Sequence, residues 1–190
     1  MPHKGVDTTL IASQIVVALQ SIVSRNVNPI ENIVISVCSF HTETNTYNVI
    51  PETVQMRGTV RTFKPEVQQL VRARIDDLVT GIAASYGAVA EVIHFSGPPA
   101  LINHENEADL AAEVALAVCG IAHRDLELTM GGEDFSEMLM ERPGAYLFIG
   151  NGNSADLHHP SYEFNDEAIP FGCSWFVRMA ERRLSFELKG

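Results

Sequence analysis

The chain has 190 residues, of which 46% are hydrophobic and 19% charged, and its 13 Lys and Arg against 24 Asp and Glu give a formal net charge of −11. Such a chain can bury a sizeable core, which excludes extensive disorder, and its negative charge would repel a phosphate backbone, which argues against a nucleic-acid partner. Three widely spaced cysteines are typical neither of a disulfide framework nor of a structural zinc site, so we expect a cytoplasmic protein.

A helix with one apolar face is expected from Asp7 to about Asn26. Asp7 is a residue type favoured at the N-cap, and apolar residues follow it at the i, i+4 spacing of one helical face. The stretch follows Lys4 as the apolar segment of a signal peptide would, but polar residues interrupt it and no small-residue cleavage site follows. It is also too polar and too short to span a membrane, so we expect a core helix and no membrane contact.

Two strands and a second helix are expected next. Ile33–Cys38 is a short β-branched run, and after a turn-rich segment at His41–Asn45 the residues Thr53–Arg61 alternate between apolar and polar. One face of this second strand carries Val54, Met56 and Val60, and the other carries Gln55, Arg57, Thr59 and Arg61. The proline in Lys64-Pro65-Glu66 marks the start of the helix, and Gly87 marks its end.

A third strand is expected at Ala88–Phe95. The order helix, strand, strand, helix, strand is that of a ferredoxin-like two-layer unit, of the α+β class, that lacks its first strand. That strand is normally central in such a sheet, so its absence would leave strand edges free to pair with another chain. We therefore expect this unit to dimerise or to aggregate.

The Gly97-Pro98-Pro99 segment breaks the pattern, and we place a domain boundary there, between residues 1–97 and residues 98–190. The second part mixes helices with an apolar strand, which is typical of α/β layering, and its length suits a portion of a larger α/β domain. Its expected elements are helices at Glu107–Val118, Phe135–Met140 and Asp166–Ser185 and a buried strand at Ala145–Ile149.

Two histidines form the densest polar cluster of the second part. His158 and His159 follow the expected strand through a Gly- and Asn-rich loop, and functional residues collect on loops that a strand positions. Imidazole is the commonest zinc ligand, so one of the two could bind a metal ion. The alternative is a pair of solvated loop histidines, since one His pair does not complete a metal site.

Two further groups of residues could bind a substrate. Gly131 and Gly132 allow close approach of a ligand to the backbone, whereas the carboxylates that follow them, Glu133 and Asp134, could equally be acids favoured in the first turn of a helix. In the first part, Asn48 and Arg61 could together hold a carboxylate, because a guanidinium forks onto it and an amide adds a neutral donor. The alternative is that Asn48 is a turn residue and Arg61 a solvated sheet residue.

Three motifs in one order resemble those of a known family. The motifs are N-V-I-P-E with R-G-T-V-R-T-F, then G-G-E-D-F-S, then L-H-H-P-x-Y-x-F-N-D-E-A-I-P. They are similar to the C-terminal half of the dinuclear-metal amidohydrolases and carboxypeptidases, which include hippurate hydrolase, N-acyl-L-amino-acid amidohydrolases and the plant indole-acetyl-amino-acid hydrolases. The similarity covers nearly the whole chain.

This resemblance implies a catalytic domain that holds two divalent ions, zinc or else manganese, cobalt or nickel, and that is interrupted by a dimerising lid domain. Residues 1–97 would be the lid without its first strand, and residues 98–190 the last part of the catalytic domain. By position, His158 matches a metal ligand of the family. Asn48 and Arg61 match residues that hold the carboxylate of the substrate. Gly131, Gly132, Glu133 and Asp134 match an active-site wall.

The resemblance also implies the reaction, hydrolysis of the amide bond of N-acyl amino acids by a metal-bridged water. The family supplies the general base and the other metal ligands from a segment that precedes the part matched here. We therefore expect a fragment of an amidohydrolase with no catalytic residue of its own, which as an isolated chain neither hydrolyses amides nor binds the two ions tightly. Its partners would be a small N-acyl amino acid and a second copy. The alternative is a non-catalytic dimerisation or carboxylate-binding module.

Overall fold

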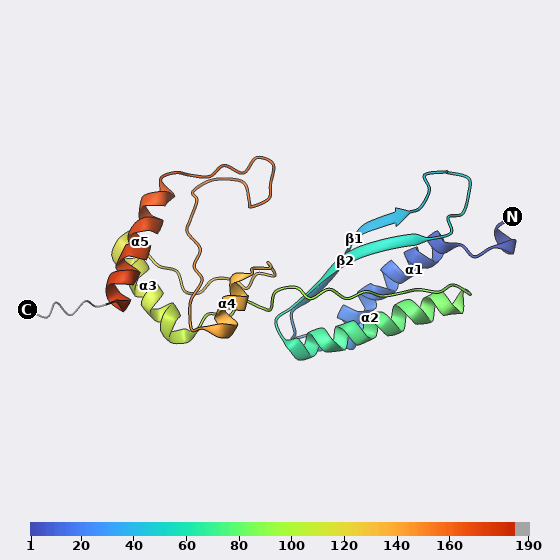
Figure 1. The fold of residues 1–190 in the computed structure, drawn as a ribbon, viewed down its shortest axis with the longest axis horizontal. Helices are drawn as coiled ribbons and strands as arrows, with labels where there is room; N and C mark the ends of the chain where they lie inside the picture. The colour runs from blue at the N-terminus through green and yellow to red at the C-terminus, as the bar shows by residue number, and fades with distance from the viewer. Residues whose placement is uncertain (185–190) are drawn as a thin grey trace, which may run out of the picture. The chain divides into compact units, whose positions relative to one another are not determined.

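The computed structural model describes residues 1–184 and divides into two compact units (Figure 1). The first unit contains Met1–Ala100 together with Met130–Gly132, and the second contains Leu101–Thr129 and the residues from Glu133 onward. The first unit combines two long helices with a two-stranded sheet, whereas the described part of the second unit is built on helices. The chain as a whole thus mixes helices and strands, as expected.

The first helix, α1 (Thr8–Ser21), begins at the predicted cap. The side chain of Asp7 accepts a hydrogen bond from the backbone N–H of Leu10 at 3.0 Å, and the helix continues through a π-helical turn, η2 (Ile22–Asn26). By length and composition, the stretch Thr8–Asn26 with a mean hydropathy of 1.2 could cross a membrane, so the prediction that it is too short and too polar is wrong. One face of the same stretch lies in the core of the unit, as in a core helix.

The sheet is an antiparallel pair of β1 (Ile33–Thr42) and β2 (Val54–Thr62), with a bulge between Val37 and Ser39. A β-carbon at Gly58, opposite the bulge, would collide with the carbonyl oxygen of Ser36, which explains the glycine at this position. The predicted turn at residues 41–45 is wrong at its start, because the ladder with β2 continues through His41 and Thr42.

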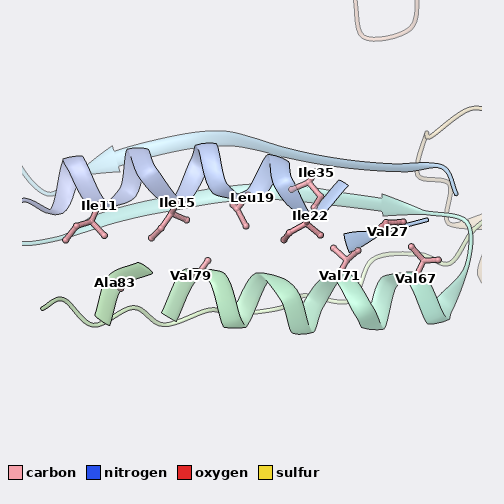
Figure 2. Close-up of a cluster of buried hydrophobic side chains, with 10 residues drawn as sticks. All are labelled: Ile11, Ile15, Leu19, Ile22, Val27, Ile35, Val67, Val71, Val79 and Ala83. Atoms are coloured by element: carbon pink, nitrogen blue, oxygen red, sulfur yellow. The ribbon is translucent and has the colours of Figure 1, made fainter. Parts of the chain in front are cut away.

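The second helix, α2 (Pro65–Ser85), starts at the predicted proline and is followed by Gly87 with a φ of 77°. Its apolar face meets the apolar face of α1, and Figure 2 shows the two rows of side chains pointing toward each other. The cluster consists of Ile11, Ile15, Leu19, Ile22, Val27, Ile35, Val67, Val71, Val79 and Ala83. Met56 and Val60, on the predicted apolar face of β2, pack against it.

The predicted strand at 88–95 does not form. The segment runs beside α2 (Figure 1), where Asp76 pairs with His94 at 2.7 Å and Arg72 donates to the carbonyl of Phe95 at 3.3 Å. Ala88, Ala90 and Val92 pack against the core while Val89, Ile93 and Phe95 are exposed, so alternate side chains face the core as they would in a strand. Within the described residues the sheet consists of β1 and β2 alone, so no ladder includes this segment.

The second unit contains α3 (Glu105–Cys119), α4 (Phe135–Glu141) and α5 (Ala168–Arg183). These confirm the three predicted helices, although the predicted end of the last one, Ser185, lies outside the described residues. Helices α3 and α5 are joined by the indole N–H of Trp175, which donates to the carbonyl of Ala111 at 3.1 Å, and by ion pairs of Arg182 with Glu113 and Arg183 with Glu107.

The predicted buried strand at 145–149 is also wrong. The Asn103 side chain accepts from the N–H of Tyr146 at 2.8 Å and donates to its carbonyl at 3.0 Å, so an amide side chain takes the place of a neighbouring strand. Leu147, Phe148 and Ile149 are exposed. An apolar run alone could not distinguish a buried strand from this irregular segment.

The contact of α1 with α2 predicts a sharp difference between two neighbouring positions of α1. Ile15 is 3% exposed in the core, whereas Val17 is 69% exposed. Ile15→Ala should lower the free energy of unfolding by about 2 to 5 kcal/mol, because it leaves a cavity between the helices. Val17→Ala should change it by less than about 0.5 kcal/mol. Urea unfolding of both variants measures the difference, and equal effects would contradict this description of the core.

Candidate functional site

The loop between β1 and β2 carries Asn48 and is closed by one acidic side chain. Glu43 accepts from the backbone N–H of Glu52 at 2.6 Å through Oε1, and through Oε2 it accepts from the N–H of Thr53 at 3.2 Å and its hydroxyl at 2.8 Å. These bonds lower the pKa of the Glu43 carboxyl group. The bond from the Glu52 N–H has the largest effect, followed by the bond from the Thr53 hydroxyl. The carboxylate thus joins the two ends of the loop in its ionised form.

A shallow hollow of about 340 Å³ lies against this loop. Neutral polar side chains line much of it, among them Thr42, Thr44, Thr46 and Asn48. The loop is also fixed to the start of α1, where the Thr8 hydroxyl donates to the carbonyl of Pro51 at 2.7 Å. Asn48 is exposed and belongs to an anchored loop, so its amide is available to a ligand.

Arg61 lies at the other end of the hairpin. It pairs with Val34 at the end of the ladder remote from the loop, and seven residue steps along β2 separate it from Val54, which is about 23 Å in a strand. The prediction that Asn48 and Arg61 hold one carboxylate together is therefore wrong for a single chain. Sequence separation could not show this, because the 12 residues between them include most of the extended strand β2.

Arg61 instead contacts a glycine of another predicted group. A β-carbon on Gly132 would lie 2.8 Å from Nη1 of Arg61 and 3.3 Å from its Cζ, so the guanidinium packs directly on the glycine backbone. Both residues belong to the first unit, together with Gly131. Close approach of a side chain is thus the physical role of glycine at 132.

Glu133 fixes the start of α4. Its Oε1 accepts from the N–H of Phe135 at 3.1 Å and its Oε2 accepts from the hydroxyl of Tyr146 at 3.1 Å, and these two bonds, in that order, lower the pKa of Glu133. Burial, followed by the nearby Glu133 carboxylate, raises the pKa of Tyr146. Asp134 occupies the N-cap position without a side-chain capping bond. The helix-start interpretation therefore describes Glu133 well, and Tyr146 is a partner that the sequence did not reveal.

The structure separates the roles of the two neighbouring histidines. Nδ1 of His159 accepts from the N–H of Ser161 at 3.1 Å, so this ring stabilises its own turn. His158 is exposed and has a φ of 67°, a conformation that non-glycine residues rarely adopt and that a surrounding structure must enforce. Backbone strain of this kind concentrates at functional positions. The two histidines thus differ in that Nδ1 of His159 is engaged within its turn, whereas His158 has the unusual backbone conformation.

The loop that carries His158 is closed by amide and hydroxyl side chains. Asn151 donates to the carbonyl of Glu163 at 2.6 Å and accepts from the N–H of Asn165 at 2.7 Å. The Ser154 hydroxyl both donates to the carbonyl of Glu163 and accepts from its N–H, each at 3.1 Å. The sequence indicated only that Asn151 and Ser154 belong to a loop, because asparagine and serine are frequent in turns.

The residues present do not fit a two-ion metal centre on their own. Within residues 1–184 no three His, Cys, Asp or Glu side chains lie close enough together to hold a metal ion. A catalytic zinc ion takes three protein ligands and a water molecule, and His158 would supply one such ligand.

Comparison with known proteins gives the family. Residues 6–182 match the pattern of Peptidase family M20/M25/M40. An N-acetyl-L-cysteine deacetylase of Bacillus subtilis (strain 168) is 38% identical over 184 residues, which are 97% of this chain and 44% of that enzyme. A hippurate hydrolase of Campylobacter jejuni is 32% identical over 188 residues, 96% of this chain and 48% of the hydrolase.

A solved structure agrees with these relatives. The Bacillus subtilis YXEP protein, described as a dinuclear metal binding peptidase from the M20 family, has a TM-score of 0.74 and 32% identity, and the match covers 95% of this chain and 47% of that one. The chain belongs to the Peptidase family M20/M25/M40, which confirms the family resemblance seen in its motifs. It spans about half the length of the relatives it matches.

The contact of Arg61 with Gly132 predicts a specific effect of one methyl group. Gly132→Ala should displace the guanidinium, because the new β-carbon would lie 2.8 Å from Nη1. The melting temperature should change little, since the end of a flexible side chain can move. The NMR signal of the Arg61 Nε–H group reports the displacement. Gly131→Ala is the control, because a β-carbon at Gly131 meets nothing within 4 Å, and an equal shift in both variants would contradict the contact.

Proposed function

We propose that this chain is the substrate-carboxylate-binding part of an M20 amidohydrolase that cleaves N-acyl amino acids. The observation that carries the proposal is the Arg61 guanidinium packed on Gly132, which joins two residues from different motifs of the family. A guanidinium offers two parallel N–H donors to a carboxylate, and the absence of a β-carbon at Gly132 leaves room for the guanidinium at this position. The names of the relatives support an N-acyl amino acid such as hippurate as the substrate class.

Asn48 contributes to the same ligand from a second copy of the chain. One chain holds Asn48 and Arg61 at opposite ends of its hairpin, so both can reach one carboxylate only if two chains supply them. A homodimer formed through the first unit meets this requirement. In this proposal residues 1–97 form a lid, ferredoxin-like and completed by one further strand, and residues 98–190 form part of the catalytic domain. The three cysteines are free and exposed, which suits the proposed cytoplasmic location.

His158 is the proposed metal ligand, and Glu133 and Asp134 form part of the wall of the active site. In a complete enzyme of this class, two divalent ions would activate the water that attacks the amide. This chain would contribute the His158 imidazole, which lies in the loop closed by Asn151 and has a φ of 67°. Because no three metal-ligating side chains lie together within residues 1–184, we expect the isolated chain not to hydrolyse amides.

The carboxylate role of Arg61 is tested by hippurate binding to the chain. Arg61→Ala should weaken binding by about 2 to 4 kcal/mol, since it removes the charged partner of the carboxylate. Arg57→Ala is the matched control, because Arg57 is an exposed arginine of the same strand. Isothermal titration calorimetry measures both. Equal affinities of the Arg61→Ala variant and the unaltered chain would show that the carboxylate is held elsewhere.

The metal role of His158 is tested by zinc titration followed through the ring signals of the histidines. Zinc should shift the His158 ring, and His158→Ala should remove this response while His159→Ala keeps it. Hippurate hydrolysis by the zinc-treated chain is measured in parallel and should be absent. Tight binding of two zinc ions together with hippurate hydrolysis would overturn the proposal that the isolated chain is inactive. The absence of any zinc-induced shift of the His158 ring signal would overturn its role as a metal ligand.

A further inference from the structure

The loop that presents Asn48 has little apolar packing of its own to hold it. Tyr47 is 99% exposed and Val49 is 58% exposed, so the tip of the loop gains little from burial. A segment of this kind is ordinarily mobile, because few buried contacts offset the entropy of ordering it. Its conformation must therefore depend on hydrogen bonds at its base.

Glu43 makes the bonds that close this base. One side chain accepts three hydrogen bonds at 2.6, 2.8 and 3.2 Å from two consecutive residues at the far end of the loop. Both carboxylate oxygens are used, so the side chain is fixed in orientation as well as in position. Asn48 lies midway between Glu43 and Thr53. The clamp thus sets the course of the segment on which Asn48 lies.

We propose that Glu43 is a positioning residue for Asn48 and thereby determines how tightly the chain binds a substrate carboxylate. This inference rests on the proposed function, because it takes Asn48 as a ligand-binding residue. Glu43 itself touches no substrate. It acts by holding the loop in the bound conformation before the ligand arrives, so that binding does not have to order the loop.

The charge of Glu43 allows a decisive test, because two effects predict opposite signs. As a clamp, the carboxylate favours binding by ordering the loop. As a bare negative charge near a carboxylate site, it would oppose binding through repulsion. Glu43→Gln removes the charge at nearly constant size. It also replaces one acceptor oxygen by an NH2 group, which cannot accept hydrogen bonds from the backbone N–H groups at this position. Loss of affinity therefore indicates the clamp, and gain of affinity indicates repulsion.

The experiment measures hippurate affinity with the full chain, using the side-chain amide signal of Asn48 in a labelled sample. Glu43→Gln should weaken binding by about fivefold or more, a moderate part of what charged hydrogen bonds contribute in proteins. Thr53→Val, which removes only the hydroxyl bond, should weaken it less. Glu52→Gln is the matched control, since it makes the same charge change in the same loop and should leave affinity within about twofold. Hippurate methyl ester, which lacks the carboxylate, should not shift the Asn48 signal.

Asn48→Ala separates failure of this inference from failure of the proposed function. If Asn48→Ala weakens hippurate binding and Glu43→Gln does not, Glu43 is not a positioning residue. If Glu43→Gln then lowers the melting temperature while the affinity is unchanged, the role of Glu43 is purely structural. Tighter binding by Glu43→Gln also overturns the inference. If Asn48→Ala has no effect, the assignment of Asn48 to the carboxylate is wrong, and the inference fails with it.

Discussion

The antiparallel pairing of β1 with β2 is the constraint on which the arrangement of the candidate site depends. Its register places the loop of Asn48 at one end and Arg61 at the other. An isolated two-stranded hairpin is at best marginally stable in water, so the pairing needs support. Helices α1 and α2 provide it, because their facing apolar side chains form the core on which Ile35, Met56 and Val60 pack.

Within each unit, polar side chains stabilise the irregular backbone that carries the candidate residues. Glu43 closes one loop, Asn151 closes another, and Glu133 fixes the start of α4 through a backbone N–H and a tyrosine hydroxyl. Such contacts order loops that bury little apolar surface, and loops of this kind commonly carry binding residues. The chain therefore orders these loops with charge and hydrogen bonding, and its core with apolar contacts.

Half of each relative's length lies outside the match, and the chemistry of the described residues is consistent with that division. Carboxylate recognition needs one guanidinium and a few neutral donors, which are the chemical groups of Arg61 and Asn48. A two-ion centre needs several ligands converging on one point, and His158 alone offers only one. The described residues thus include candidate carboxylate-binding groups but no cluster of three metal-ligating side chains.

The sequence by itself determined the family, the helices and the hairpin. Helix periodicity and caps are local signals, so the sequence predicts the bounds of α1, α2, α3 and α4 within a few residues. The motifs identified the family because they preserve the order of its residues. Only the tertiary structure decided that 88–95 and 145–149 form no strands, since pairing depends on a partner that a local pattern does not reveal. It also decided which site residues meet: Arg61 lies on Gly132 and far from Asn48, because the straight path of β2 separates residues that the sequence places close together.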